Sequence, residues 1–469
     1  MMTQASSEHS ICIGIENNLA GKAKKLIEKD FDYEIETQQI NPISIENNLS
    51  IIALVGEKMK SHQGVSGKMF SALGRNNVNV KAIAQGASER NITAVIDSTN
   101  TKQALNILHE AFFETDIKQI NLFITGVGNV GSKLIEQLNS QKEYLQNQLR
   151  LNIKVAGISN SRKMLIDANG IDLNHWDELL SKGEKADPST FFEHIKNLNL
   201  RNSIFVDNTA NEEIAHTYPP FLKSSISVVT CNKIAAAETY EYYSHLKQLA
   251  RTYNAPYLFE TNVGAGLPII DTLNHLITSG DKVHTIQAIL SGSLNFVFNE
   301  YNEKTTFREV VQQAMDAGFT EPDPKIDLSG VDVARKILIL ARESGLQMEL
   351  QDIENESFLP QDCLDTKDND SFLSSLDDHN DHFKSLFTLA ASKNCRLKYV
   401  AELVDGKARV GLKEIPIGHD FYNLSGSDNI VLFYTDRYNY QPLIVKGAGA
   451  GGEVTASGIF ADIIRISKR

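Results

Sequence analysis

An acidic loop and the helix that follows it hold the densest group of side chains that could do chemistry. Residues 317–336 read Ala-Gly-Phe-Thr-Glu-Pro-Asp-Pro-Lys-Ile-Asp-Leu-Ser-Gly-Val-Asp-Val-Ala-Arg-Lys. Two prolines stiffen a loop that bears Glu321 and Asp327, and Asp332 and Lys336 follow one helical turn apart. Carboxylates and an ammonium group near a nicotinamide would suit a substrate with an amino group and a reducible carbonyl.

The pair formed by Asp332 and Lys336 also has a simpler interpretation. An Asp and a Lys four residues apart on a helix usually form a surface salt bridge. On a helical wheel both fall in the polar arc beside Arg335 and Glu343. Helical periodicity alone therefore leaves both interpretations open.

A glycine-rich turn provides a place for such a nicotinamide. It follows an apolar stretch at 121–125 and opens a helix that runs through Leu138, which is the context that a dinucleotide fingerprint requires. Its glycines permit a tight turn, close approach to a pyrophosphate and helix packing, and the helix N-terminus favours phosphate. A glycine-rich turn without a ligand is the alternative. The predicted cofactor residues are Gly126, Val127, Gly128, Asn129, Val130 and Gly131.

The next strand, at 153–158, bears on the choice of cofactor. Ser-Asn-Ser-Arg-Lys follows it at 159–163, without the carboxylate that would hold free ribose hydroxyls. Arg162 or Lys163 could pair with a 2′-phosphate, which favours NADP(H) over NAD(H). A solvated basic loop is the alternative.

Two further polar segments follow predicted strands. Thr209 lies in the first, at 207–210, and Lys233 ends the second, at 230–233. Ligands of open α/β sheets bind at this carboxyl edge, although ordinary turn chemistry explains such residues equally well.

The elements that must position these residues begin with an internal repeat. Gln-Ala-Ser-Ser-Glu-His-Ser-Ile at 4–11 returns as Gln-Gly-Ala-Ser-Glu-Arg-Asn-Ile at 85–92, an offset of 81 residues. The first copy begins only at its third strand. Gly64 and Gly67 open a helix in the second copy, and the free N–H groups of a helix start suit an anion. The alternative is that they are ordinary glycines of a helix start. Periodicity predicts for the second copy strand 51–55, helix 65–76, strands 78–84 and 92–96, and helix 101–113.

From residue 121 onward, strands alternate with helices, which predicts a doubly wound parallel sheet. A second region runs from about 263 to 440, and we interpret its acidic stretch at 352–381 as a loop-like, solvated insertion. The expected strands of the parallel sheet are 121–125, 153–158, 203–206, 227–230 and 257–260.

Composition narrows the class of protein. A chain of 469 residues that is 42% hydrophobic predicts about three domains, and a net charge of −13 argues against nucleic-acid and polybasic membrane binding. The twelve histidines suggest no transition-metal site, and no apolar run is long enough to span a membrane, so we expect a cytoplasmic protein. We expect buried, reduced thiols at the four scattered cysteines, Cys12, Cys231, Cys363 and Cys395.

Four segments and the glycine fingerprint together resemble homoserine dehydrogenase from about residue 120 to the end. The preceding repeat resembles the paired ACT modules of bifunctional aspartokinase/homoserine dehydrogenase. The Lys-Phe-Gly-Gly motif of the kinase is absent, so we expect no kinase activity from this chain, and the incomplete first module indicates a truncated sequence. The four segments are Thr261–Pro268 (Thr-Asn-Val-Gly-Ala-Gly-Leu-Pro), Ser291–Asn295 (Ser-Gly-Ser-Leu-Asn), 318–336 and Gly447–Gly451.

The resemblance implies an α/β fold with a Rossmann-type doubly wound parallel sheet and an α+β catalytic and dimerisation domain, preceded by ferredoxin-like ACT modules. The implied divisions are a partial ACT module (1–48), an ACT module (49–116), the dinucleotide-binding domain (117–262), the catalytic and dimerisation domain (263–440) and a C-terminal segment (441–469) that returns to the nucleotide-binding domain.

The implied reaction is the reversible, NAD(P)H-dependent reduction of L-aspartate 4-semialdehyde to L-homoserine, on the route to threonine and methionine. A homodimer or higher oligomer and regulation by L-threonine are also implied. By resemblance, the residues are Lys336 as proton donor with Asp332; Glu321, Asp327 and Lys233 for the substrate; Lys233, Thr209 and Gly451 at the cofactor; carbonyls of Glu260, Val263, Ala265 and Leu267 for a sodium or potassium ion; and Gln4 and Gln85 for the effector.

Two other functions are alternatives to this reaction. An amino-acid-sensing protein on a non-catalytic dehydrogenase scaffold would be favoured by loss of Lys336, Asp332 or a fingerprint glycine, and all are present. A dehydrogenase of 2-hydroxy acids would need an arginine for the substrate carboxylate and a catalytic histidine, and neither is evident.

Overall fold

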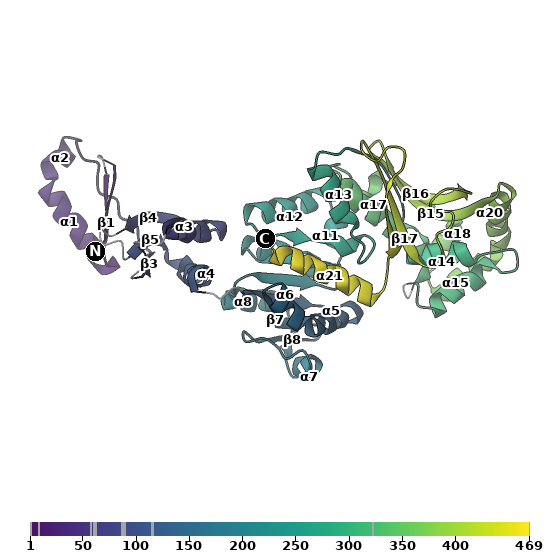
Figure 1. Cartoon of the computed structure of the whole chain (residues 1–469), viewed down its shortest axis with the longest axis horizontal. Helices are drawn as coiled ribbons and strands as arrows, with labels where there is room; N and C mark the ends of the chain where they lie inside the picture. Colours follow the sequence, from purple (N-terminus) through teal and green to yellow (C-terminus); the bar gives the residue numbers. More distant parts are fainter. Residues whose placement is uncertain are drawn as a thin grey trace. The chain divides into compact units, whose positions relative to one another are not determined.

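The computed structural model describes residues 2–7, 10–56, 59, 63–85, 91–113, 117–320 and 323–468 (Figure 1). The chain divides into two compact units. The first comprises Met1–Lys118 with Lys196–Arg201, and the second comprises Gln119–Ile195 with Asn202–Arg469.

The first unit contains an antiparallel sheet with the described strand order β3-β5-β4, covered by two helices. On β3, Ile52 and Leu54 are buried with the helices, whereas Ile51 and Val55 are exposed, because alternate side chains point to opposite faces. The predicted order of elements is confirmed: β3 (Leu49–Val55), α3 (Val65–Arg75), β4 (Val80–Gln85), β5 (Asn91–Asp97) and α4 (Thr101–Phe113).

The N-terminal segment repeats the second half of this arrangement. The short helix η1 at Asn17–Leu19 lies 81 residues before η3 at Ser98–Asn100, so the structure confirms the repeat. The elements of this segment are β1 (Met2–Ser7), β2 (Ser10–Gly14), η1, α1 (Ala20–Asp30) and α2 (Asp32–Glu36).

The second unit begins with a sheet in the strand order β12-β11-β10-β6-β7-β8-β9, in which the first four strands are parallel. Every residue of β10 is buried, as expected for a strand covered on both faces. The parallel-rich sheet is therefore confirmed. Its strands are β6 (Lys118–Thr125), β7 (Leu151–Ser159), β8 (Lys163–Ile166), β9 (Glu184–Lys185), β10 (Ser203–Asp207), β11 (Ser227–Thr230) and β12 (Tyr257–Leu258). The strand expected at 257–260 is shorter, because the short helix η4 begins at Glu260.

The helices of this sheet come from both ends of the unit. α21 packs against α5, and its Ile459 and Ile463 join Leu134 and Ile135 in one core, as Figure 1 shows for the yellow helix among the blue and teal elements. The helices are α5 (Asn129–Ser140), α6 (Lys142–Gln148), α7 (Trp176–Ser181), α8 (Pro188–Leu198), α9 (Glu212–Ala215), α10 (Tyr218–Lys223), α11 (Ile234–Ala237), α12 (Tyr240–Thr252) and α21 (Gly452–Ser467).

The second unit also contains a mixed sheet of the order β14-β16-β15-β13-β17-β18. Its neighbours are antiparallel except β14 and β16. The strands are β13 (Val283–Ile289), β14 (Glu354–Glu356), β15 (Cys395–Val404), β16 (Lys407–Pro416), β17 (Asp428–Thr435) and β18 (Leu443–Ala448), and the helices are α13 (Ile269–Thr278), α14 (Gly292–Glu300), α15 (Phe307–Asp316), α16 (Pro324–Leu328), α17 (Val331–Glu343), α18 (Gln361–Leu364), α19 (Asn369–Asp378) and α20 (Asn380–Ser392).

The acidic stretch at 352–381 is not the solvated loop that we expected. It contains β14, α18 and α19, and on α19 Phe372, Leu373 and Leu376 are buried. The acidic composition concealed this helical spacing of apolar residues, which packs against the domain.

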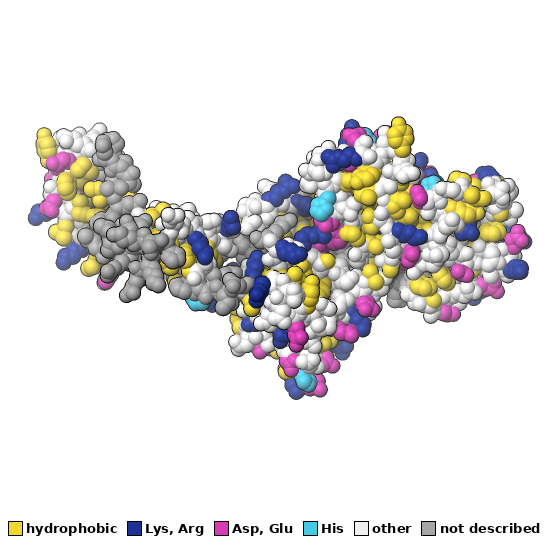
Figure 2. Space-filling model, viewed as in Figure 1, with side chains coloured by type: hydrophobic (Ala, Val, Ile, Leu, Met, Phe, Trp, Pro, Cys, Tyr) yellow, Lys and Arg dark blue, Asp and Glu magenta, His cyan; other side chains and the backbone are white. Residues whose placement is uncertain are grey.

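The cysteines are free, as expected, but only Cys363 is buried, whereas Cys12 is exposed. Among the described helices, none has the length and apolarity needed to cross a membrane. Figure 2 shows Lys and Arg interspersed with Asp and Glu over this face of the second unit.

Candidate active site

Helix α17 buries Lys336 and places Asp332, whose side chain is 32% exposed, beside it. The Nζ atom of Lys336 lies 2.8 Å from Oδ2 of Asp332 and donates a hydrogen bond of 2.6 Å to the carbonyl of Leu290. Lys336 is only 8% exposed. The interpretation of this pair as a surface salt bridge is therefore wrong.

The start of α17 is fixed by a glycine that has no room for a side chain. Gly330 has a φ of 75°, and a Cβ there would collide with the hydroxyl of Tyr399 on β15. The first turn of α17, which carries Asp332, is thereby held against the mixed sheet.

A second lysine reaches Asp332 from the parallel sheet. Lys233 follows β11 at the carboxyl edge of that sheet, and its Nζ lies 3.0 Å from Oδ1 of Asp332. One carboxylate thus joins two ammonium groups. We refer to Lys233, Asp332 and Lys336 as the Lys-Asp-Lys group.

The pKa values in this group are strongly perturbed. Burial raises the pKa of Asp332, but the charges of Lys336 and Lys233 outweigh it and hold that pKa well below its usual value. Burial lowers the pKa of Lys336, Lys233 adds to that shift, and Asp332 opposes it. An ammonium group with a lowered pKa is a better proton donor than an ordinary lysine.

Asp327 on α16 lies beside this group. Oδ1 of Asp327 is 3.0 Å from the hydroxyl of Ser293, and that hydroxyl also lies 2.6 Å from the carbonyl of Phe319. The charge of Asp327 opposes the lowering of the pKa of Lys336. Sequence reasoning missed Ser293 as a supporting residue, although it stands within the quoted motif at 291–295. Glu321 lies outside the described residues.

The glycine fingerprint has the geometry of a nucleotide turn. The N–H of Gly126 donates to the carbonyl of Ser159 at 2.9 Å, and its φ is 88°. A Cβ at Gly131 would collide with the carbonyl oxygen of Gly126, whereas a Cβ at Gly128 would meet nothing within 4 Å. The turn therefore leaves open space at Gly128, where a pyrophosphate needs to approach.

The remaining residues of the turn contact either the hydrophobic core or the start of α21. Val127 and Val130 pack against the core beneath the sheet. A Cβ at Gly452 would lie 2.5 Å from Oδ1 of Asn129, so α21 begins close to the fingerprint. Gly451, just before α21, has a φ of 116° and open space around its Cβ position.

A cavity of ≈ 370 Å³ lies at the carboxyl ends of β6, β7 and β10. A cavity with aromatic walls suits a planar base. Its lining includes Gly126, Asn160, Thr209 and the rings of Phe191, Phe205 and Phe221.

The two basic residues beside this cavity differ. Asn160 accepts hydrogen bonds from the N–H groups of Arg162 and Lys163 at 2.8 and 2.7 Å, which fixes the turn. The Nζ of Lys163 donates to the carbonyl of Gly183 at 2.9 Å, whereas the side chain of Arg162 is exposed. Arg162 is therefore the better placed of the two for a 2′-phosphate.

The first polar segment begins with a buried carboxylate, to which sequence reasoning gave no role and which connects the two segments. Asp207 is fully buried and accepts from the N–H of Thr209 at 2.8 Å, the hydroxyl of Tyr218 at 2.6 Å and the amide of Asn232 at 3.0 Å. Burial raises its pKa, and hydrogen bonds from Tyr218 and Thr209 oppose that shift. The sequence feature that could have identified this residue is an Asp at the end of an apolar strand.

The loop expected to hold a monovalent cation is a tight turn. The carboxylate of Glu260 caps α13 by accepting from the N–H groups of Ile270 and Asp271 at 2.7 and 2.9 Å, so its side chain is already occupied. Gly264 and Ala265 have φ values of 77° and 52°. Backbone oxygens then remain as the donors, and oxygen suits a hard cation. The residues named for this ion are Glu260, Val263, Ala265 and Leu267, and the first three are buried.

The backbone of the two glutamines expected to bind the effector is described, but their side chains are not. Gln4 stands on β1 and Gln85 on β4, but their side chains are outside the described part of the chain. Gly64 precedes α3 with a φ of 83° and open space at its Cβ position.

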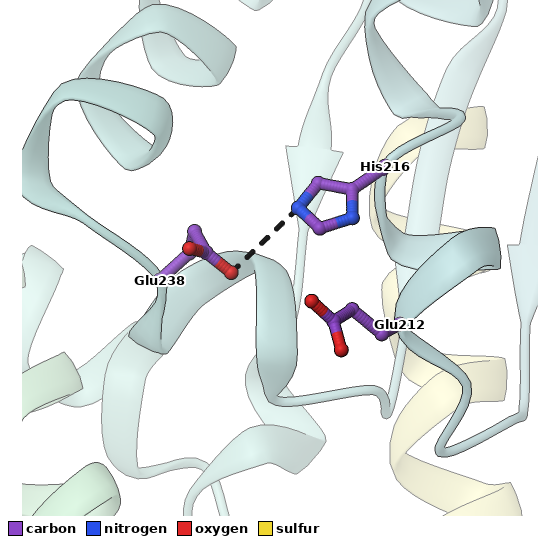
Figure 3. A group of neighbouring side chains, drawn as sticks. All are labelled: Glu212, His216 and Glu238. Atoms are coloured by element: carbon purple, nitrogen blue, oxygen red, sulfur yellow. Dashed lines mark ion pairs between the residues drawn. The ribbon is translucent and has the colours of Figure 1, made fainter.

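Glu212, His216 and Glu238 form a group that the sequence did not indicate (Figure 3). Nε2 of His216 lies 3.6 Å from Oε2 of Glu238. We assign the group no ligand, because Glu212 and His216 are exposed and the ion pair alone accounts for the proximity of His216 and Glu238.

Comparison with known proteins agrees with this geometry. Family models described as "Homoserine dehydrogenase", "Homoserine dehydrogenase, NAD binding domain" and "ACT domain" match residues 268–464, 126–260 and 52–112. Homoserine dehydrogenase of Schizosaccharomyces pombe is 34% identical over 74% of this chain and 95% of its own length. Bifunctional aspartokinase/homoserine dehydrogenase of Haemophilus influenzae is 41% identical over 99% of this chain, and a chloroplastic one of Arabidopsis thaliana is 41% identical over all of it.

The chain spans 57% and 51% of those two bifunctional relatives. Among solved structures, a hyperthermophilic archaeal homoserine dehydrogenase in complex with NADPH has a TM-score of 0.59 and 27% identity, covering 75% of this chain and 98% of that one.

Proposed function

The chain belongs to the homoserine dehydrogenase family, and from that premise we propose that it catalyses the reversible reduction of L-aspartate 4-semialdehyde to L-homoserine with NAD(P)H. The Lys-Asp-Lys group is the observation that carries this proposal. It lies where the edge of the nucleotide-binding sheet meets a helix of the mixed sheet, which is where a hydride donor and a carbonyl must meet.

In this proposal Lys336 is the proton donor. A bound reduced nicotinamide would supply the hydride that reduces the carbonyl carbon. Lys336 donates its proton to the carbonyl oxygen as negative charge develops there, and takes a proton from the hydroxyl in the reverse reaction. Asp332 holds the ammonium group in place without removing its proton, because its own pKa is far lower.

The carboxylates beside this group suit the rest of the substrate. We assign Asp327 and Glu321 to the substrate ammonium, and Lys233 to the substrate and the edge of the cofactor. Ser293 orients Asp327 through its hydroxyl.

The remaining assignments belong to the same proposal. Arg162 favours NADP(H) over NAD(H). Thr209 and Gly451 contact the cofactor. The backbone at 260–267 holds a sodium or potassium ion. L-Threonine is the effector of the ACT region, through Gln4 and Gln85, and the protein is a homodimer or larger. The domain boundaries near residues 48, 116, 262 and 440 are part of this proposal.

Steady-state oxidation of NADPH and of NADH with L-aspartate 4-semialdehyde tests the function. Succinic semialdehyde, which lacks the amino group, is the matched substrate. We expect turnover of the first and a much lower kcat/KM for the second. Absence of turnover by a folded protein with either cofactor would favour the alternative, a regulatory protein with an inactive dehydrogenase scaffold.

A further inference from the structure

Lys398 is a buried cation outside the group described above. It lies on β15 and is 0% exposed. Among the described residues it forms no ion pair, and the one charge that acts on it is that of Arg396, which together with burial lowers the pKa of Lys398 to about 8. Burying an unpaired ammonium group is costly unless its protons are all donated to well-placed acceptors.

Three acceptors surround the ammonium group of Lys398. Its Nζ lies 2.8 Å from Oδ1 of Asn295, 2.6 Å from Oδ1 of Asn299 and 2.7 Å from the carbonyl of Leu424. An ammonium group has three donors, so each acceptor receives one. The two asparagines stand one turn apart on α14, and Leu424 lies in the segment before β17.

The same asparagines tie α14 to that segment. The amide groups of Asn295 and Asn299 donate to the carbonyl of Gly426 at 3.0 and 3.2 Å. A Cβ at Gly292 would lie 3.0 Å from the carbonyl oxygen of Ser427, so the start of the helix also rests on this segment. Lys398 therefore fixes both partners of one contact.

The first turn of α14, which includes Gly292, also lies beside the Lys-Asp-Lys group. Leu290, two residues before the helix, accepts from Lys336 at 2.6 Å, and Ser293 in the first turn lies 3.0 Å from Asp327. A displacement of α14 would move both contacts together.

We propose that Lys398 is a positioning residue for the dehydrogenase reaction: it fixes α14, so that Leu290 and Ser293 hold Lys336 and Asp327 in place. This inference rests on the proposed function. Lys398 touches neither Asp327 nor Lys336 itself, and acts on them only through the helix.

Lys398→Met, which keeps an unbranched side chain one atom shorter and none of its donors, tests the inference. We expect kcat to fall about tenfold or more, because misplacement by about 1 Å can cost on the order of 10²-fold. The Kd for NADPH should change less than about twofold, because α14 takes no part in the nucleotide turn. A folded Lys398→Met variant with wild-type kcat would overturn the inference.

A double-mutant cycle with Ser293→Ala separates positioning from general destabilisation. If Lys398 acts through Ser293, the double variant should lose less activity than the product of the two single losses. Independent, multiplicative losses would remove Ser293 from the inference. Lys247→Met is the control, since it removes a different lysine, which is partly buried and paired with Glu343, and should leave kcat within about twofold.

Two measurements keep the inference testable if Lys398→Met does not fold or if the wild type shows no turnover. Asn299→Ala removes one of the three acceptors at a partly exposed position and should give a smaller loss in the same direction. Hydrogen exchange, which needs no turnover, should increase in α14 and at 424–428 in either variant. Unchanged exchange there contradicts the positioning role, whereas an inactive wild type contradicts only the proposed function.

Discussion

Replacing Lys336 by methionine removes both a proton donor and a positive charge from the point where the carbonyl oxygen becomes negative. General acid catalysis typically contributes about 10²–10⁴-fold, and one electrostatic contact in a buried site about 10²–10³-fold. Because one side chain supplies both in the same transition state, the losses do not simply multiply. We expect kcat to fall about 10³-fold, which corresponds to about 4 kcal/mol.

The pH dependence follows from the perturbed pKa values of the same group. In the direction of reduction Lys336 must be protonated, and its pKa is lowered, so kcat should decline with rising pH earlier than an exposed lysine would allow. The lowered pKa of Asp332 keeps that carboxylate ionised throughout the range. Lys336→Arg retains the charge but cannot release a proton, so it should recover only part of the rate and lose the alkaline decline.

Initial rates of NADPH oxidation across pH, with the Kd for NADPH measured separately, test these expectations. The Kd should stay near the wild-type value in both variants, since the nucleotide turn lies on another element. Lys247→Met serves as the control for loss of a lysine. The proton-donor assignment fails if Lys336→Met keeps a kcat within about tenfold of wild type, or if Lys336→Arg is fully active.

Three other expectations can be checked directly. Arg162→Glu should shift kcat/KM from NADPH towards NADH by repelling a 2′-phosphate, and an unchanged ratio would place Arg162 in solvent. Gly131→Ala should abolish cofactor binding in calorimetry, because its Cβ collides with the Gly126 carbonyl oxygen; wild-type affinity would contradict the fingerprint geometry. Gln85→Ala should weaken L-threonine binding in calorimetry more than Gln4→Ala, because the first module is incomplete, and equal affinities in all three proteins would exclude both glutamines.

The nucleotide-binding turn was predictable because its determinants are local. Gly126 and Gly131 stand between a strand and a helix, and their spacing alone specifies the close approach that the structure shows. The repeat was also predictable, because its two copies carry the same short motif and the same order of elements.

The burial of Lys336 beside Asp332 was not predictable from periodicity. Asp332 and Lys336 occupy the polar arc of α17, where Arg335 is exposed but Lys336 is buried and bonded to the carbonyl of Leu290 from another part of the chain. The roles of Asp207 and Lys398 were not predictable for a similar reason. Each is a charged residue in a strand, and its buried partners lie on other elements, so that only the tertiary structure identifies it.

The return of α21 to the nucleotide-binding sheet places the mixed sheet, along the chain, between the strands of that sheet and its last helix. The amide of Gln137 on α5 donates to the carbonyl of Glu453, 316 residues later in the chain. The intervening chain must be brought back before Ile459 and Ile463 can complete the core, and such distant closure slows folding. Heat should therefore melt the two sheets in one cooperative transition, and residues 119–262 produced alone should expose an apolar face and aggregate.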